Sequence, residues 1–460
     1  MGQEALKLLS ADKRLKVKIF SLPDKISSNI LSPYSGMNNV EIVWGDLTVE
    51  EDVLKAVNCV DYIIHMGAVI PPAADYYPQL AEKVNYGGTL NVIKAVKRQG
   101  DPDSIRLVYI GSVAETGSRL PPKHWVRTGD PIKVSKFDNY GKTKVKAERA
   151  VAESGLKYWV SLRQTGMLHY NLLNSMDPII FHQPLNTHVE WVTLEDTGRL
   201  LYNLCTFDLP EKFWRNIYNI GGGPEYRQTY MGFMDSVYKI LGVGNFKKMF
   251  NPAWFAVRNF HCSWFKDSDI LENYLHYRQQ GFTDYLKKLK RRIPSAARIL
   301  KYIPAVIVKK LVMEPLAKQT NGPIGWLKRG DFEKLEAFYG SAEGWKKRTP
   351  GWPDYDDSVS VDGRRDVEIS HGWDESKDPA SLNIEDMRQA AEFRGGKCLS
   401  ASMKTGDIYT PLEWECSLGH KFLASPYIIL KGGHWCPECD VNPFMYEEEA
   451  RENNFLAQVL

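Results

Sequence analysis

The first 170 residues alternate short β-branched runs with segments of helical spacing, and this alternation limits the possible folds more than any other feature of the chain. The runs that predict strands lie at residues 15–20, 40–44, 60–65, 106–111 and 157–163. Helical spacing appears between them, at residues 50–57 and 86–98. Strands that alternate with helices form parallel sheets covered by helices. We therefore expect an α/β fold with a doubly wound parallel sheet in residues 1–170.

The rest of the chain divides into further segments, because 460 residues exceed one ordinary core. Residues 171–350 are aromatic and basic, and we expect them to form a substrate-binding region with a helical extension. Residues 351–380 are acidic and rich in turn formers, which predicts a linker. A small cysteine-bearing module is expected at 381–445, followed by a tail at 446–460.

Charge, hydropathy and cysteine content restrict the partners and the compartment. A formal net charge of +3, with no dense basic strip in the cysteine module, does not indicate a nucleic-acid partner. No run of about 18 apolar residues exists, so no transmembrane helix is expected. Seven cysteines, four of them after residue 397, fit a reducing compartment with one metal site. We expect a cytoplasmic protein.

Residues 285–316 mix Lys and Arg with Ile, Leu and Val at helical spacing. The favoured interpretation is a solvated helix that packs by its apolar face. A basic amphipathic helix can also lie on a membrane surface or cover a pocket, so peripheral membrane contact is an alternative.

A chemical pattern appears at Tyr140 and Lys144, which are four residues apart and so face the same side of a helix. The positive charge of Lys144 is expected to lower the pKa of Tyr140, so that the phenol can give or take a proton. Ser112 directly follows a predicted strand and can supply a second hydroxyl. Alone, this spacing is weak evidence, because two such residues on a solvated helix face are the more common case.

Seven short motifs in a fixed order give the pair a context. They occupy residues 45–47, 65–68, 84–89, 110–117, 163–166, 190–196 and 218–223. Over residues 2–225 this series resembles the extended short-chain dehydrogenase/reductase superfamily, which includes NAD-dependent sugar-nucleotide epimerases and dehydratases and hydroxysteroid dehydrogenases.

The resemblance implies a Rossmann-type domain that binds NAD or NADP, with Ser112, Tyr140 and Lys144 as catalytic residues. It implies a cofactor site formed by Gly2, Asp46, Leu47, Met66, Gly67, Ala68, Asn85, Tyr140, Lys144, Gln164, Gly166 and Met167. It also implies a homodimer. The substrate is expected to be a small molecule, and the aromatic residues Trp254, Phe255, Phe260, Trp264 and Phe265 favour a bulky or hydrophobic one.

Two departures from the family pattern affect the activity. The family's first strand and Gly-x-x-Gly-x-x-Gly loop have no counterpart ahead of the helix expected at residues 3–9, and Gly2 matches only the third glycine. Either the sequence as given starts late, which we favour, or this copy has lost cofactor binding. The second departure is at Val113 and Ala114, where sugar 4,6-dehydratases carry an Asp-Glu pair. Neither side chain moves a proton, which disfavours dehydration.

The predicted function is therefore an NAD(P)-dependent oxidoreductase or epimerase that transfers hydride at a hydroxyl or keto carbon, with Tyr140 as acid/base. The alternative is a catalytically impaired nucleotide-sensing or scaffold protein that docks partners through its cysteine module.

That module contains two short ligand pairs, Cys416/His420 and Cys436/Cys439, separated by residues 421–435. Thiolates and an imidazole at this spacing are typical of tetrahedral structural zinc. Cys398 could replace one ligand, although a lone cysteine is more often a core residue. The module resembles small zinc-ribbon or treble-clef units, which implies a stabilising or protein-docking role.

Overall fold

The computed structural model describes residues 1–170, 176–242, 245–293, 302–347, 351–352 and 366–460. Four parallel strands form the central sheet in the order β10-β6-β4-β3. They are β3 (Tyr62–His65), β4 (Arg106–Ser112), β6 (Trp159–Gln164) and β10 (Asn216–Ile220). The predicted parallel α/β sheet is confirmed, with strand boundaries within two residues of those expected.

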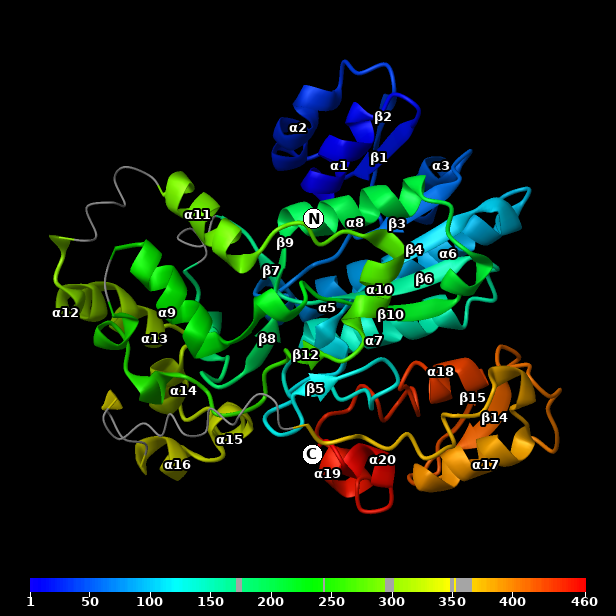
Figure 1. Ribbon diagram of the computed structural model, residues 1–460. Helices are drawn as coiled ribbons and strands as arrows, with labels where there is room; N and C mark the ends of the chain where they lie inside the picture. Colours follow the sequence, from blue (N-terminus) through cyan, green and yellow to red (C-terminus); the bar gives the residue numbers. More distant parts are fainter. Residues whose placement is uncertain (171–175, 243–244, 294–301, 348–350, 353–365) are drawn as a thin grey trace.

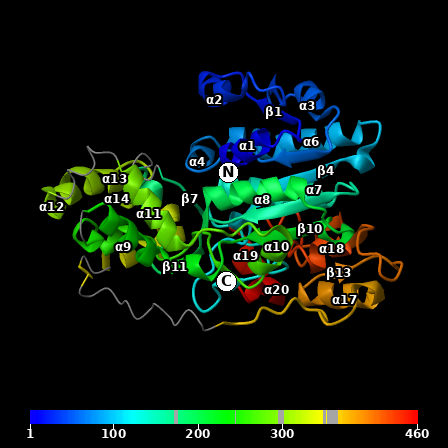
Figure 2. The ribbon, with the colours of Figure 1, turned by 45° about the horizontal axis from the view of Figure 1, so that its top comes forward.

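The strands β1 (Val17–Ser21) and β2 (Val40–Trp44) form a separate parallel pair. Within the described ranges, no strand pairs with the second edge of β1 or with the second edge of β3. This pair and the short helix α2 (Lys25–Leu31) lie on the side of the central sheet opposite the C-terminal module (Figures 1 and 2).

Both faces of the central sheet are covered, because successive side chains of a strand point to opposite faces. On β4, Val108 and Ile110 pack with α1 (Gly2–Ala11) and α8 (Leu194–Thr206). Leu107 and Tyr109 face the other way, into a second core. This second core contains residues of three helices: α3 (Glu50–Val57), α6 (Gly88–Lys97) and α7 (Asn139–Ala152).

The C-terminal module shares that second core. Its strands β13 (Lys397–Cys398), β14 (Leu412–Glu415) and β15 (Lys421–Ala424) form an antiparallel sheet, flanked by α17 (Ile384–Phe393) and α18 (Pro426–Leu430). Tyr427 packs edge-on against Trp159 of β6, and its hydroxyl accepts the backbone N–H of Ile217. The module is thus joined to the Rossmann-type domain by a continuous hydrophobic core.

The segment expected to be a tail is folded. Residues 446–460 contain α19 (Tyr446–Glu449) and α20 (Asn454–Ala457), because Leu456 and Val459 pack into a small core with Ile369. Lys133 Nζ also donates to the Val459 carbonyl at 2.7 Å. Of the expected linker, residues 366–380 are described and include the buried Ile369, whereas residues 353–365 lie outside the described part of the chain.

Helices within residues 230–240 and 282–347 build a lobe beside the sheet (Figure 1), whereas α10 (Ser268–Leu275) packs on β10 of the sheet itself. The helices of the lobe include α9 (Tyr230–Ile240), α11 (Phe282–Arg292), α12 (Ala305–Val308), α13 (Glu314–Ala317), α14 (Pro323–Arg329), α15 (Phe332–Tyr339) and α16 (Ala342–Lys347). The helix expected over residues 285–316 is described in part, since residues 294–301 lie outside the described ranges. In the described residues, no helix is long and apolar enough to span a membrane.

The aromatic residues of this region are mostly core. Trp254 and Phe255 pack edge-on around Phe181, and Phe265 is fully buried. Their density therefore reflects packing of the lobe and does not by itself indicate a hydrophobic substrate.

Candidate active site and metal centre

The end of β4 fixes Ser112. Its backbone N–H donates to Glu115 Oε1 at 2.7 Å, and its Oγ accepts the Ala114 N–H at 3.2 Å, which forms a capping box around the short turn Val113–Glu115. The Ser112 side chain is buried and lies close enough to Tyr140 to favour the ionised form of the phenol. The structure thus brings together two of the three predicted catalytic residues.

Tyr140 and Lys144 lie on α7, whose first turn is capped by Asp138 through an Oδ1 contact with the Gly141 N–H at 2.7 Å. Lys144 Nζ lies 5.7 Å from the Tyr140 ring centroid and 4.8 Å from that of Tyr109. It donates to the Ile110 carbonyl at 2.7 Å. The expected one-turn spacing therefore places both side chains at the end of β4.

The electrostatics differ from the sequence-based expectation. Burial raises the pKa of Tyr140, and the nearby Ser112 side chain only partly opposes this rise. Burial lowers the pKa of Lys144 to about 8, although Glu115 and Glu148 favour its charged form. The expected lowering of the Tyr140 pKa is therefore not found in this structure, because burial of the phenol dominates.

A buried charge network behind Ser112 has no counterpart in the sequence-based prediction. Arg163 Nη2 donates to Glu148 Oε1 at 2.6 Å and to the Gly432 carbonyl at 2.8 Å. His434 Nε2 lies 2.9 Å from the same Glu148 oxygen, and Arg163 Nε lies 3.4 Å from Glu115 Oε2. The side chains of Arg163, Glu148, Glu115 and His434 are fully buried.

The two carboxyl groups of this network have opposite protonation preferences. Burial opposes the ionisation of Glu148, but Arg163 and His434 outweigh it and hold the pKa of Glu148 below its usual range. Burial and the charge of Glu148 raise the pKa of Glu115 well above its usual range. Ionisation is therefore favoured at Glu148 and disfavoured at Glu115. No sequence signal could reveal this, because Gly432 and His434 are more than 250 residues from Arg163.

The predicted cofactor residues form two groups. Near β3, a Cβ atom on Gly2 would lie 2.8 Å from Met66 Sδ, and one on Gly67 would lie 3.2 Å from Leu47 Cδ2. Ala68 follows Gly67 in the loop after β3. Asp46 Oδ1 accepts the Thr48 N–H at 2.8 Å.

The second group lies nearer α7 and β6. Asn85 Nδ2 donates to Thr143 Oγ1 of α7 at 2.9 Å. Gln164 aligns with Ser112 across β6 and β4, and Gly166 and Met167 follow it. The Gln164 Oε1 and Thr165 Oγ1 atoms are buried and have no hydrogen-bond partner among the described residues. Buried polar atoms without a partner, at the carboxyl end of a parallel sheet, are suited to hydrogen-bond the amide group of a nicotinamide ring.

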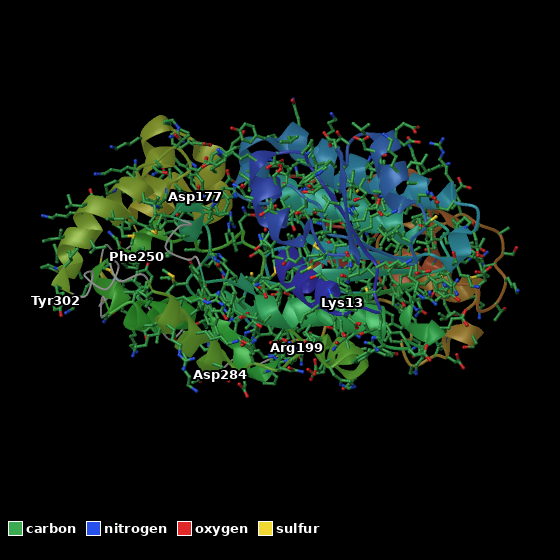
Figure 3. The ribbon with its side chains drawn as sticks, turned by 90° about the horizontal axis from the view of Figure 1, so that it is seen from above. Lys13, Asp177, Arg199, Phe250, Asp284 and Tyr302 are labelled. Atoms are coloured by element: carbon green, nitrogen blue, oxygen red, sulfur yellow. The ribbon has the colours of Figure 1, made fainter. Side chains whose placement is uncertain are left out.

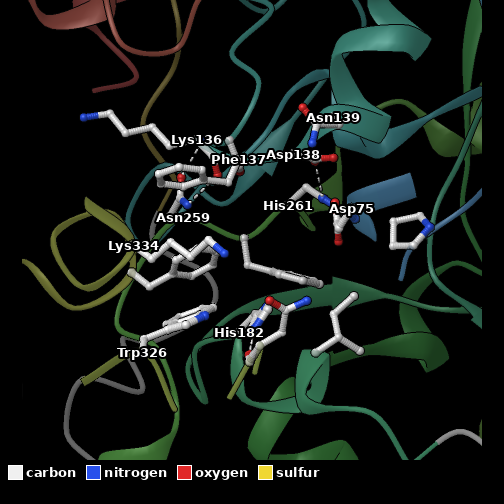
Figure 4. A pocket seen from close by; sticks show the side chains of 16 residues that line it. Asp75, Lys136, Phe137, Asp138, Asn139, His182, Asn259, His261, Trp326 and Lys334 are labelled. Carbon is white, nitrogen blue, oxygen red and sulfur yellow. Dashed lines mark hydrogen bonds and ion pairs between the residues drawn. The ribbon is translucent and has the colours of Figure 1, made fainter. Parts of the chain in front are cut away.

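A cavity of about 190 Å³ lies beside the first turn of α7 (Figure 4). Aromatic walls come from Phe137, Phe260, Trp326 and Phe338, and its polar groups include Asp75, Asp138, His182, His261 and Lys334. His261 Nδ1 lies 3.1 Å from Asp138 Oδ2. Burial, reinforced by the charge of Asp138, raises the pKa of Asp75 to about 7. Only Phe260 of these groups was singled out from the sequence.

The predicted metal ligands Cys416, His420, Cys436 and Cys439 converge in the module, with their ligand atoms all within 4.8 Å of one another. Cys416 Sγ lies 3.8 Å from Cys439 Sγ, and the three sulfurs lie 3.4, 3.5 and 3.4 Å from His420 Nδ1. Tetrahedral zinc bonds imply about 3.8 Å between sulfurs and about 3.6 Å from sulfur to nitrogen. The geometry fits zinc. Cys398, the alternative ligand, lies on β13 outside this group.

Residues 1–161 match the sequence profile described as the 3-beta hydroxysteroid dehydrogenase/isomerase family. No curated protein matches the chain. A DesIV double mutant, a dTDP-glucose 4,6-dehydratase from Streptomyces venezuelae with NAD and DAU bound, is similar at 17% identity and a TM-score of 0.50, over 63% of this chain and 92% of that one.

The dTDP-glucose 4,6-dehydratase rfbB from Bacillus anthracis str. Ames, in complex with NAD, is similar at 15% identity and a TM-score of 0.50, over 63% of this chain and 91% of that one. At these identities the likeness concerns the fold. About 63% of the chain thus shares the Rossmann-type fold of these structures, and its first 161 residues match the 3-beta hydroxysteroid dehydrogenase/isomerase family.

Proposed function

We propose that the protein is an NAD(P)-dependent oxidoreductase or epimerase of the extended short-chain dehydrogenase type, acting at a hydroxyl or keto carbon. The observation that carries this proposal is the contact between Ser112 and Tyr140 at the carboxyl end of a parallel sheet, with Lys144 one helical turn further on. The NAD-bound state of the two similar dehydratases and the family match of residues 1–161 support it.

The side chains suit proton transfer. When bound, the nicotinamide would supply or accept the hydride. Tyr140 would exchange a proton with the substrate oxygen, while the Ser112 hydroxyl orients that oxygen. The buried Lys144 would place a positive charge beside the phenol as it loses its proton, and Gln164 and Thr165 would hold the cofactor amide.

Within this class we infer oxidoreduction or epimerisation without loss of water. Val113 and Ala114, directly after Ser112, are buried apolar residues. Neither side chain can act as a proton donor or acceptor for elimination. The two similar structures are dehydratases, so the product of the reaction must distinguish dehydration from oxidoreduction or epimerisation.

We also infer that Cys416, His420, Cys436 and Cys439 hold a structural zinc ion. Three thiolates and one imidazole would complete the tetrahedron and leave no open position for substrate. Glu438 Oε2 lies 3.5 Å from His420 Nε2, on the side of the ring away from the sulfurs, and would orient the imidazole. The shared core with α7 and β6 favours a stabilising role for the module.

Fluorescence titration with NADH and with NADPH tests the proposal. The full chain should bind one of them and Lys144→Met should bind more weakly, whereas Lys142→Met on the same helix should bind like the wild type. The alternative, a nucleotide-sensing scaffold, predicts the same binding but no turnover of any hydroxyl or keto substrate. Failure of both dinucleotides to bind would refute the enzyme and the sensor alike.

A further inference from the structure

One surface of the helical lobe is rich in exposed apolar side chains, which the proposed chemistry does not require. Six apolar side chains within residues 302–312 are exposed by more than a third. They are Tyr302 (76%), Leu311 (71%), Val306 (56%), Ile307 (45%), Val312 (45%) and Ile303 (36%). Single exposed apolar residues are normal on soluble proteins, but a contiguous group of this size marks an interaction site. Figure 3 shows Tyr302 at the outer end of the lobe.

The inner side of the same helical segment is well packed. Val308, Met313 and Leu316 are buried in the core of the lobe. A π-helical turn over Lys309–Met313 follows α12, and its extra residue per turn places more residues on the outward side of the helix. As a result, three consecutive residues, Lys310, Leu311 and Val312, are exposed together. The segment is therefore seated on the lobe by one side and presents a second apolar side outward.

Positive charge borders this apolar surface. Lys309 and Lys310 belong to it, and the turn Phe246–Lys248, which adds Lys247 and Lys248, packs against α12. Lys309 and Lys247 lie over the rings of Trp254 and Trp352, at 5.6 and 5.2 Å from the ring centroids. Residues 302–313 and 245–254 contain no Asp or Glu, and the adjacent Glu314 is paired with Lys318 at 2.6 Å.

We propose that residues 302–312, together with Lys247, Lys248, Lys309 and Lys310, form a basic apolar patch that binds the surface of an anionic lipid bilayer. The apolar side chains would enter the boundary between headgroups and acyl chains, and the lysines would contact lipid phosphates. A second copy of the chain fits less well, because a symmetric contact would bring lysines together with no carboxylate to pair with. The proposal is independent of the catalytic function.

Vesicle co-sedimentation of the full chain tests this patch. Wild type should bind vesicles of phosphatidylcholine with phosphatidylserine at least about tenfold more tightly than vesicles of phosphatidylcholine alone, because each lysine near an anionic surface contributes about 1 kcal/mol. The double variant Val306→Ser/Leu311→Ser should lose most binding to the anionic vesicles. Lys248→Gln/Lys310→Gln should weaken it about tenfold and reduce the preference for phosphatidylserine by the same factor.

The matched control is Ile26→Ser/Leu423→Ser, which removes two comparably exposed apolar side chains (74% and 68%, against 56% and 71%) elsewhere on the surface. This control should bind like the wild type. No binding of wild type to either vesicle, or equal losses in the control, would overturn the proposal. Sedimentation velocity supplies the other contrary result: a wild-type dimer that becomes monomeric in Val306→Ser/Leu311→Ser would show that a second copy covers the patch.

Discussion

His434 Nε2, in the C-terminal module, lies 2.9 Å from Oε1 of Glu148, on the helix that carries Tyr140 and Lys144, and neither side chain is exposed to solvent. Arg163 completes the contact by binding both Glu148 and the Gly432 carbonyl. A buried charged group that loses a partner is costly, because water cannot replace it. The module therefore stabilises helix α7, which carries Tyr140 and Lys144, and the neighbouring strand β6.

This contact predicts a stability effect. His434→Asn, whose shorter side chain cannot reach Glu148, should lower the free energy of unfolding by about 2–4 kcal/mol. Urea denaturation followed by circular dichroism measures it. His276→Asn makes the same change at an exposed histidine and should stay within about 0.5 kcal/mol of wild type. Equal stability of the two variants would contradict the role of the buried pair.

The metal centre predicts a stoichiometry. Freshly purified wild type should contain about one equivalent of zinc per chain by elemental analysis, since four ligands complete one tetrahedral site. Cys436→Ser should lose that zinc and unfold at lower temperature. Cys398→Ser, at a cysteine outside the group, should keep it. Less than half an equivalent in wild type would rule out the proposed site.

The cavity beside α7 predicts a dependence of stability on pH. The pKa of Asp75 is raised to about 7 in the folded protein. At pH values between the ordinary carboxyl pKa and about 7, Asp75 is therefore protonated in the folded state and ionised in the unfolded chain. Its contribution to stability is therefore present at low pH and falls as the pH rises through this interval.

Asp75→Asn keeps the shape of the protonated side chain and cannot ionise. It should gain about 1–2 kcal/mol over wild type at about pH 8, because partial solvent exposure reduces the full effect of burial, and nothing at about pH 3, below the ordinary carboxyl pKa. Urea denaturation at the two pH values measures the difference. Asp103→Asn, at an exposed aspartate, should show no such gain. A gain for Asp75→Asn that is the same at both pH values would contradict the assignment.

The apolar pair after Ser112 predicts the type of product. If a nucleotide hexose is turned over in the presence of NAD, mass spectrometry should find an epimer or an oxidised sugar that has not lost water. A dehydrated product would show that other residues supply the acid and base, and Val113 and Ala114 would no longer limit the reaction.

The fold and the local parts of the site could be predicted from the sequence because their signals are local. Strand periodicity located β1 to β4 and β6, and the one-turn spacing placed Tyr140 beside Lys144. The cysteine spacing correctly grouped the four candidate zinc ligands. Each of these follows from residues within about 25 positions of one another.

The rest depended on tertiary contacts between distant segments. The pairing of Glu148 with His434 exists only after the module packs on α7, and the burial that raises the pKa of Tyr140 likewise arises only in the folded protein. The acid–base behaviour of Tyr140 was mispredicted for the same reason. The expectation considered the positive charge of Lys144 but not the burial of that side chain. Residues 446–460 lack a strong periodic pattern, yet Leu456 and Val459 suffice to dock them.

The central claim is that Tyr140 transfers the proton that accompanies hydride transfer. The most direct test is a screen of hydroxysteroids and nucleotide sugars with NAD and NADP, in which formation of the reduced nicotinamide is followed by absorbance, and any substrate found is repeated with Tyr140→Phe. The account predicts that Tyr140→Phe still binds the dinucleotide but loses at least about 100-fold in kcat, as removal of a general acid/base does. A Tyr140→Phe variant with wild-type kcat would contradict it.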